Sequence, residues 1–512
     1  MTALVHPRFA DVAALGREPH YDGAVRECTE SDAGHSHKEC GSLPTVATMM
    51  PVTRCPEDAA EKAAASAPSY PPPGYAWYVV GVLTLAYFFS FVDRQIVSMM
   101  IGPIKRDFNL SDSQVGLLSG TAFALFYTFF GIPVGRWADT RSRRALIAAG
   151  FVSWSVMTAG CGLARQFWQL LLCRMGVGVG EATLSPAAYS LIADYFPPER
   201  RATAISVYSL GIYLGSGLAL VCLGLLLGFV GSDSMVTLPW FGSVRPWQLV
   251  FFVVGLPGVL CAGLLATVRE MPRRGSHVRE RQGGTKGATA LPLREVNCWF
   301  KAHWKTFGTL FLGMASLTFA GYANSQWMVE LFARRHGWAP AQTGVICGTL
   351  VALTGSAGAI FGGRWADRYH RRGYVDANNR VALAGALVML PGAVLYPAAG
   401  TGAWAAVFLV PLMIGLSMAF GVTAAAVQQL VPAGMRAQAS ALYLFVINLL
   451  GMGLGPLAVG WLSDRVSPGG QMLHYSVLIA LCAGTLLAVL LFALGLKPYR
   501  ATMATIRMAA SD

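Results

Sequence analysis

Charged residues are scarce in this sequence. Only 13% of its 512 residues are Asp, Glu, Lys or Arg, whereas soluble domains carry about 25%. Hydrophobic residues make up 54%, and the mean hydropathy is +0.50. A chain of this composition lacks the polar side chains needed to cover a soluble fold, so a soluble globular protein is excluded.

Motifs for several other functions are also lacking. The sequence has no phosphate-cradling Walker loop, which leaves ATP-driven pumping without support, and it has neither an HExxH helix nor a nucleophile elbow. The ten cysteines show no CxxC spacing, so neither a disulfide framework nor a zinc site is indicated. No basic stretch is interleaved with a nucleic-acid-binding motif. We therefore expect no enzyme activity, no cofactor, no metal and no nucleic-acid partner.

Long apolar runs dominate from about Trp77 onward. Each is long enough to cross a hydrocarbon core of about 30 Å, and continuous runs of this kind indicate helices, because the alternation of a barrel strand is absent. We predict an all-α membrane protein with twelve transmembrane helices. The expected spans are 76–101, 114–135, 144–164, 167–193, 203–229, 247–268, 306–331, 342–363, 380–399, 403–429, 438–462 and 473–496.

The loops on one side of the predicted membrane carry most of the Lys and Arg residues. Because basic loops stay in the cytoplasm, both termini are expected there, in a multi-pass protein of the cell (inner) membrane. An Arg-rich linker at 269–305 divides the chain into two six-helix bundles. A polar tail, which we expect to be cytoplasmic, lies at each end of the chain. The predicted parts are a disordered tail at 1–75, bundles at 76–268 and 306–496, a linker at 269–305, and a tail at 497–512.

A pentapeptide, Gly-Arg-Trp-Ala-Asp, occurs at 135–139 and again at 363–367, and a basic cluster follows each copy. Glycine permits close helix approach, and the Asp can accept hydrogen bonds from a helix N-terminus or an Arg. Two such loops could hold the cytoplasmic side together in one state and release it in another. The alternative is that the basic residues of each loop only keep it in the cytoplasm. The expected gating residues are Gly135, Asp139, Arg143, Arg144, Gly363, Asp367, Arg368, Arg371 and Arg372.

These residues resemble the signature loop of the major facilitator superfamily, Gly-x-x-x-Asp-(Arg/Lys)-x-Gly-(Arg/Lys)-(Arg/Lys). In the first copy Thr140 replaces the first basic residue, and Ser142 replaces the second Gly. The resemblance covers about 76–496. It implies two pseudo-symmetric six-helix bundles around a central cavity, which work by rocking-type alternating access.

Four ionisable residues lie deep in predicted spans, where charge is costly and usually functional. They are Asp93, Arg94, Arg174 and Glu181. Arg174 and Glu181 are seven residues apart and share one helix face. Counting from the helix ends places Asp93 and Arg174 at similar depth, with Glu181 nearer the midplane.

This arrangement predicts proton coupling. Asp93 and Glu181 can exchange protons, and a guanidinium freed by protonation, from Arg94 or Arg174, can seek the other carboxylate or an anionic head group. The alternative is a structural ion-pair set that joins the first and fourth predicted helices, 76–101 and 167–193. We expect Asp93 to have the better-defined partners of the two carboxylates.

The second half offers polar but uncharged residues. A pocket is expected at Tyr322, Asn324, Gln326 and Asn448, although each is more often a helix–helix hydrogen bond. Glu330 lies four residues before Arg334, and this pair is expected to be interfacial. Charge on one wall and apolar surface on the other suits an amphiphile.

The runs 91–95 (Phe-Val-Asp-Arg-Gln), 110–118, 174–182 and 195–201 resemble the Spinster branch of the superfamily. The resemblance implies proton-linked transport of a sphingoid phosphate or lysophospholipid by a protein in contact with membrane lipids, and we expect a monomer. Two alternatives stay open. They are a proton-coupled symporter of a small organic anion, whose branch shares the Asp-Arg of helix 1, and a non-transporting receptor on the same fold.

Overall fold

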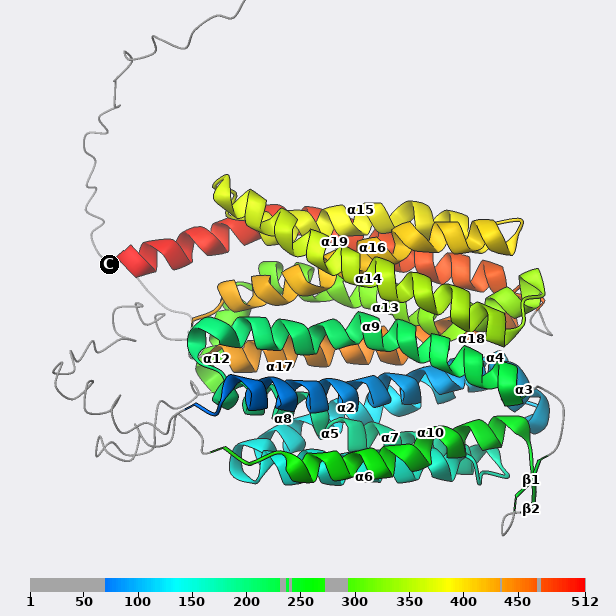
Figure 1. Ribbon diagram of the computed structural model, residues 1–512. Coiled ribbons are helices and arrows are strands. Elements are labelled where there is room, and N and C mark those ends of the chain that lie inside the picture. The colour runs from blue at the N-terminus through cyan, green and yellow to red at the C-terminus, as the bar shows by residue number, and fades with distance from the viewer. Residues whose placement is uncertain are drawn as a thin grey trace, which may run out of the picture. The chain divides into compact units, whose positions relative to one another are not determined.

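The computed structural model describes residues 70–230, 236–238, 242–271, 293–432, 435–466 and 471–511 (Figure 1). Residues 1–69 of the predicted N-terminal tail and 272–292 of the predicted linker lie outside this set. Helices follow one another with short connections, as the apolar runs predict.

The first half of the bundle begins with Pro at the first helical position of α2, where the missing N–H costs nothing. Its elements are α2 (Pro73–Met99), α3 (Ile101–Phe108), α4 (Asp112–Gly116), η2 (Leu117–Thr121), α5 (Ala122–Thr140), α6 (Arg143–Cys161), α7 (Phe167–Glu181), α8 (Leu184–Tyr195), α9 (Pro198–Val230), β1 (Val236–Leu238), β2 (Gly242–Val244), α10 (Pro246–Ala262) and η3 (Gly263–Thr267).

The second half contains longer unbroken helices. Its elements are α12 (Leu293–Ala302), α13 (Trp304–His336), α14 (Pro340–Arg371), α15 (Ala377–Ala398), α16 (Gly402–Gln429), α17 (Arg436–Val446), η5 (Ile447–Gly453), α18 (Leu454–Val466) and α19 (Leu473–Ser511). Within the predicted linker, α12 is helical, and its Trp299 donates a hydrogen bond to the carbonyl of Leu430.

The prediction of twelve spanning helices is confirmed, with one correction. Among the residues that the structure describes, eleven helical stretches are long and apolar enough to cross a membrane. The twelfth, predicted as one helix at 167–193, is divided into α7 and α8 at Ala182 and Thr183. Pro186 explains the break, because it has no N–H and its ring clashes with the carbonyl four residues earlier, that of Ala182. Ala182 and Thr183 keep right-handed helical dihedral angles, so the helix is interrupted directly after Glu181 without reversing its direction.

Two further features were not predicted. The loop between α9 and α10 contains a small antiparallel hairpin that pairs Val236 with Val244. Two helices also contain π-helical segments, η2 and η5, and these lie against each other across the two halves, where the Thr121 hydroxyl donates to the carbonyl of Gly453 at 2.7 Å. Such segments occur often at functional sites.

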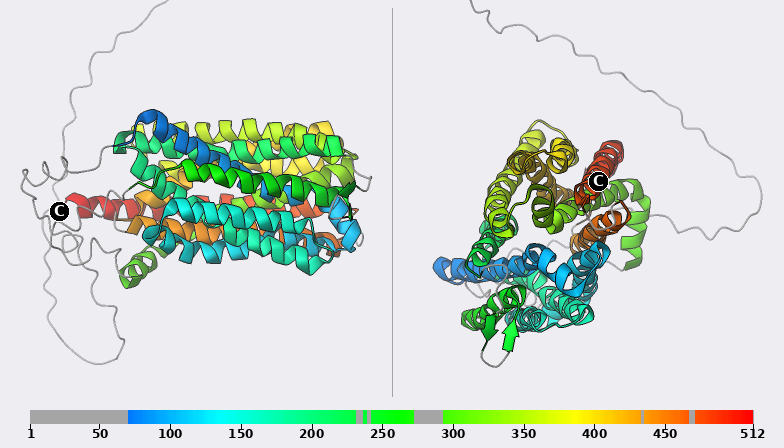
Figure 2. Two further views of the ribbon diagram at one scale, coloured as in Figure 1. Left: turned by 60° about the horizontal axis from the view of Figure 1, so that its bottom comes forward. Right: turned by 90° about the vertical axis from the view of Figure 1, so that its right-hand side faces the viewer.

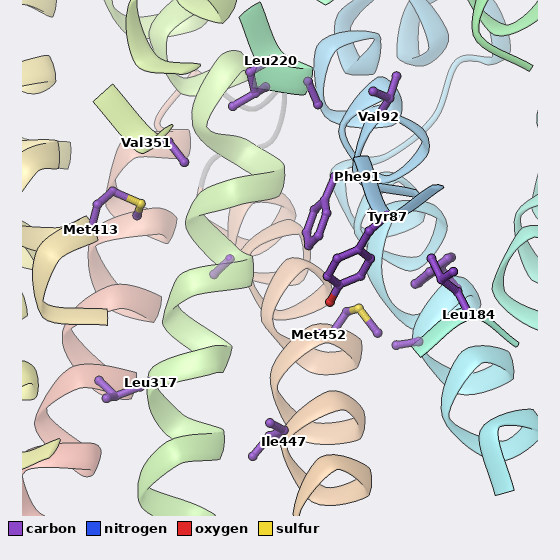
Figure 3. Close-up of a cluster of buried hydrophobic side chains, with 14 of the residues drawn as sticks. Tyr87, Phe91, Val92, Leu184, Leu220, Leu317, Val351, Met413, Ile447 and Met452 are labelled. Carbon is purple, nitrogen blue, oxygen red and sulfur yellow. The ribbon is translucent and has the colours of Figure 1, made fainter. Parts of the chain in front are cut away.

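The two halves pack through small residues and share buried side chains. A Cβ added at Gly217 of α9 would lie 2.4 Å from the Gly348 carbonyl of α14, so the two backbones are in direct contact. Tyr87 of α2 belongs to the same buried cluster as Met413 and Met452 of the second half (Figure 3). Seen along the helices, the first half (α2 to α10, blue to green) and the second half (α13 to α19, yellow-green to red) lie on opposite sides of the bundle (Figure 2).

Successive spanning helices run in opposite directions, so the connections between them lie at two ends of the bundle. The basic end contains residues 141–142, 196–197, 269–271 and 372–376, and the opposite end contains residues 100–111, 162–166 and 337–339.

Candidate functional site

The break between α7 and α8 places Glu181 against α2. Its Oε2 accepts hydrogen bonds from Arg94 Nε at 2.8 Å and from the Ser90 hydroxyl at 2.6 Å. The Glu181 side chain is 0% exposed and that of Arg94 is 11% exposed. Glu181 Oε1 has no hydrogen-bond partner among the described residues. The structure thus contains a buried ion pair that joins α2 and α7, with one carboxylate oxygen of Glu181 unpaired among the described residues.

Asp93 is also buried, but it has fewer partners. Arg174 Nη1 donates at 3.1 Å to the backbone carbonyl of Asp93, and no ion pair within 4.0 Å involves the Asp93 carboxylate in the part of the chain that the structure describes. Our expectation that Asp93 would have the better-defined partners was therefore wrong, because Glu181 has them. Sequence spacing fixes depth along a helix, but adjacent residues point about 100° apart, and here Arg94 faces Glu181.

Aromatic rings surround the Arg94 guanidinium. Its Cζ lies 5.4 Å from the ring centroid of Phe91, 5.0 Å from that of Phe123 and 4.9 Å from that of Tyr127. Arg174 also lies over Phe123, at 5.4 Å. Cation–π contacts hold a guanidinium in place while leaving its N–H groups available to a ligand.

A cavity lies between the two halves beside this ion pair. Its volume is about 1240 Å³, counting the space that is open to solvent. Arg94 lines it, and so do three of the four predicted pocket residues: Tyr322, Asn324 and Asn448. Gln326 is buried but does not line the cavity. Among the four charged residues, only Arg94 lines it, so Arg94 joins the cavity to the buried carboxylates.

Gln95 connects the walls of this cavity. Its Nε2 donates to the Ser216 hydroxyl of α9 at 2.8 Å and to the Ser325 hydroxyl of α13 at 3.1 Å. Since Ser325 belongs to the second half, this amide joins the two halves one residue after Arg94.

At the opposite end, an ion-pair cluster that the sequence did not predict joins the halves. The Asp112 carboxylate, 0% exposed, accepts hydrogen bonds from Arg334 at 2.8 and 3.0 Å, from the Ser463 hydroxyl at 2.6 Å and from Lys105. Arg334 also binds Glu330 at 2.7 Å. We call these five residues the latch. Arg334 and Glu330, expected to be a simple interfacial pair, are therefore part of a contact between the halves.

Asp464 adds to this contact from the second half. Its carboxylate accepts from the backbone N–H groups of Asp112 at 3.0 Å and Ser113 at 2.8 Å, at the start of α4. A carboxylate at a helix N-terminus is favourable. The only available sequence signal was the run 110–118, which contains Asp112 but does not indicate a partner 222 residues away.

At the basic end, the first repeat copy binds within its own half. Arg143, 1% exposed, pairs with Asp194 and with Glu270 at 2.8 Å. The Arg144 amide donates to Glu270 at 2.9 Å. Burial raises the pKa of Glu270, but the hydrogen bonds from Arg144, Arg143 and Ser142 outweigh it and leave the pKa below its ordinary value. The side chain of Asp139 lies outside the described set.

The second repeat copy differs from the first. The side chains of Asp367, Arg368, Arg371 and Arg372 are exposed, and none forms an ion pair in the described structure. The expected close approach at Gly135 and Gly363 was wrong, because a Cβ at either position would meet open space. The close contact is made one residue earlier, at Gly362, where a Cβ would lie 2.6 Å from the Met418 carbonyl.

The family model that describes the Major Facilitator Superfamily matches residues 83–456. The chain belongs to this superfamily. It is 30% identical over 414 residues to Protein spinster homolog 1 of Mus musculus, which covers 77% of this chain and 74% of that protein. It is also 30% identical over 437 residues to an MFS-type efflux pump of Mycolicibacterium smegmatis, with 84% and 94% covered. The Sphingosine-1-phosphate transporter SPNS2 of Xenopus tropicalis is 26% identical over 424 residues, with 78% and 77% covered.

Solved structures agree with these relatives. Two crystal structures of a bacterial homolog of the human lysosomal transporter Spinster, both inward-facing, are 28% identical and cover 86% of this chain and 99% of theirs. Their TM-scores are 0.65 for the unoccupied and 0.67 for the occupied form. This chain is therefore a Spinster-like transporter of the major facilitator superfamily, a multi-pass membrane protein and not an enzyme.

Proposed function

We propose that this Spinster-like transporter moves an amphiphilic lipid, such as a lysophospholipid or a sphingoid phosphate, in exchange with or together with protons. The observation that carries the proposal is the buried Arg94–Glu181 ion pair beside the cavity. The cavity has one cation on its first-half wall, and most of the surface that lines it is apolar. An anionic head group suits the cation, and an acyl chain suits the apolar surface.

The proposed coupling follows from the partners of Glu181. When Glu181 is ionised, it accepts the Nε–H of Arg94 and offsets the charge of this guanidinium at the cavity wall. When Glu181 is protonated, the ion pair weakens, and Arg94 becomes available to an anionic head group. Asp93 is adjacent to Arg94 in α2, and Arg174 lies about two turns from Glu181 in α7. These two residues complete the proposed proton pathway.

The latch supports a proposal about the conformational state of the transporter and its orientation in the membrane. It holds the halves together at the opposite end, which is the arrangement expected of an inward-facing transporter if the basic end faces the cytoplasm. The inward-facing relatives support this proposal. Alternating access then requires the latch to open, while the repeat copies at the basic end close. We propose that a single chain carries out the whole cycle.

Reconstitution into liposomes with an imposed pH gradient tests the proposal. Flux of a lysolipid, a sphingoid phosphate and a hydrophilic organic anion is compared for wild type, Asp93→Asn and Glu181→Gln. We expect gradient-dependent lipid flux that both substitutions abolish. Flux of the organic anion alone would support the symporter alternative. Lipid binding without flux, unaffected by Asp93→Asn, would support a receptor, and flux indifferent to both gradient and substitutions would overturn proton coupling.

A further inference from the structure

We propose that Asn324 and Asn448 form an amide subsite that recognises a hydrogen-bond donor in the substrate head group, beside the anion that Arg94 binds. This inference rests on the proposed function, because it assigns the second-half wall of the same cavity. It predicts that the transporter distinguishes amphiphiles by a hydroxyl or ammonium group and not by negative charge and chain length alone.

The side-chain oxygen of Asn324 is buried without a hydrogen-bond partner among the described residues. Asn324 is 1% exposed and lines the cavity. Buried amides in proteins are nearly always hydrogen-bonded, so an unpaired one calls for a specific explanation. The unpaired atom is an acceptor, and the missing partner is therefore a donor.

Asn448 lies on the same wall, on a neighbouring element. It belongs to the π-helical segment η5, which packs against α13, and the Thr318 hydroxyl of α13 lies 3.3 Å from the Ile447 carbonyl. The Asn448 side chain is half-buried and lines the cavity. A π-helical insertion changes the direction of the residues in it, and such insertions are concentrated at functional sites. Two helices of one half thus bring two amides to one cavity wall.

The first-half wall of the cavity recognises the anionic part of the head group. Arg94 lies between aromatic rings and lines the cavity from α2. A guanidinium binds an anionic oxygen, whereas a neutral amide oxygen binds an ammonium or hydroxyl without requiring a counter-charge. A head group that carries both an anion and a donor satisfies both walls at once. A plain alkyl phosphate satisfies only the first.

The test compares two substrates of equal chain length in proteoliposomes with a pH gradient. One is a sphingoid phosphate, which has an amine and a hydroxyl next to its phosphate, and the other is a simple alkyl phosphate. We expect wild type to transport the sphingoid phosphate at least about tenfold faster at limiting concentration, and Asn324→Leu to reduce this preference to about twofold or less. Alkyl phosphate flux should remain, which shows that the variant is folded. Asn448→Leu should also reduce the preference, and it provides the test if Asn324→Leu does not fold.

Gln326→Leu is the matched control. Gln326 lies on the same helix, is buried, and has an unpaired Oε1, but it does not line the cavity. It should leave the preference unchanged. Equal transport of both substrates by wild type, or a preference that survives both Asn324→Leu and Asn448→Leu, would overturn the subsite and leave the proposed function standing. Loss of preference in Gln326→Leu alone would also overturn it. Transport of neither substrate would overturn the proposed function together with the subsite.

Discussion

Arg94 is the residue at which the buried carboxylates meet the cavity. It pairs with Glu181 through Nε and lies among Phe91, Phe123 and Tyr127. Lysine keeps the charge but has neither the planar fork nor the same ability to stack on aromatic rings. We therefore expect Arg94→Lys to reduce initial transport rates at least about tenfold, measured in proteoliposomes. Arg165→Lys, an exposed arginine at the opposite end, should have little effect; similar losses in both variants would contradict this role.

Glu270 predicts a pH dependence outside the membrane. Hydrogen bonds hold its pKa below the ordinary value of 4.5, so its contribution to stability is present above that value and is lost as the pH falls through the lowered pKa. Because the pair is partly exposed, about 1 kcal/mol or less is expected. Thermal unfolding should show Glu270→Gln less stable than wild type at about pH 7, with the difference diminishing as the pH falls below 4.5.

The matched control for this prediction is Glu295→Gln in α12. Glu295 forms no ion pair in the described structure, so its substitution should not reproduce the loss of stability expected for Glu270→Gln at about pH 7. A wild-type advantage over Glu270→Gln that persists at low pH would contradict the assigned hydrogen bonds.

For single charged residues, the sequence predicted the depth of the side chain in its helix but not its ion-pair partner. The apolar context of Asp93, Arg94, Arg174 and Glu181 was sufficient to identify them as buried, and the structure confirms that all four lie within the bundle. Which guanidinium meets which carboxylate depends on helix rotation, and the periodicity of a wholly apolar helix does not fix its rotation. Asn324 could be named as a pocket candidate, but only the structure separates it from Gln326.

Among the elements, α9 and α14 form a close backbone contact between the halves. A Cβ at Gly217 would lie 2.4 Å from one backbone atom and 2.5 Å from another, and backbone atoms move less easily than side-chain ends. We expect Gly217→Ala to separate the helices, lower the unfolding temperature and reduce transport. Gly228→Ala on the same helix meets open space and gains helix propensity, about 1 kcal/mol at most, so it should be neutral or slightly stabilising. Equal effects of the two substitutions would contradict the close contact.

The pair α7 and α8 shows why element boundaries could be predicted only in part. Apolar length predicted one helix at 167–193, and the structure places α7 and α8 across the same stretch. Pro186 was a visible signal for a break, but proline in a spanning helix often only bends it. The interruption at Ala182 and Thr183 depends on how α7 and α8 pack against α5 and α6, which no local pattern describes.

At the scale of the whole molecule, the latch holds the halves together at one end. Asp112 is buried with two cations, so removing its charge leaves Arg334 without its main partner. We expect Asp112→Asn to shift the population toward a state open at the opposite end. Spin labels at Arg165 and Gly400, exposed loop residues of the two halves near this end, should show an added longer distance. An unchanged distance distribution would contradict the latch.

The latch could not be predicted because its members come from distant parts of the chain. Asp112 and Arg334 are 222 residues apart, and neither has a neighbour in sequence that indicates the other. The repeat at 135–139 and 363–367 indicated two related halves, yet its two copies differ in the structure. One copy is tied to Asp194 and Glu270, and the charged residues of the other are exposed. The repeat therefore predicted two related halves, but it did not predict the ion pairs that each half forms.

The central claim is that substrate movement and proton movement are one process at Glu181. It is tested most directly by recording internal pH in proteoliposomes when a lysolipid or sphingoid phosphate gradient is applied without any initial pH gradient. We predict that substrate flux changes the internal pH in wild type, and that Glu181→Gln abolishes this change. Substrate flux in wild type with no change in internal pH would contradict the account.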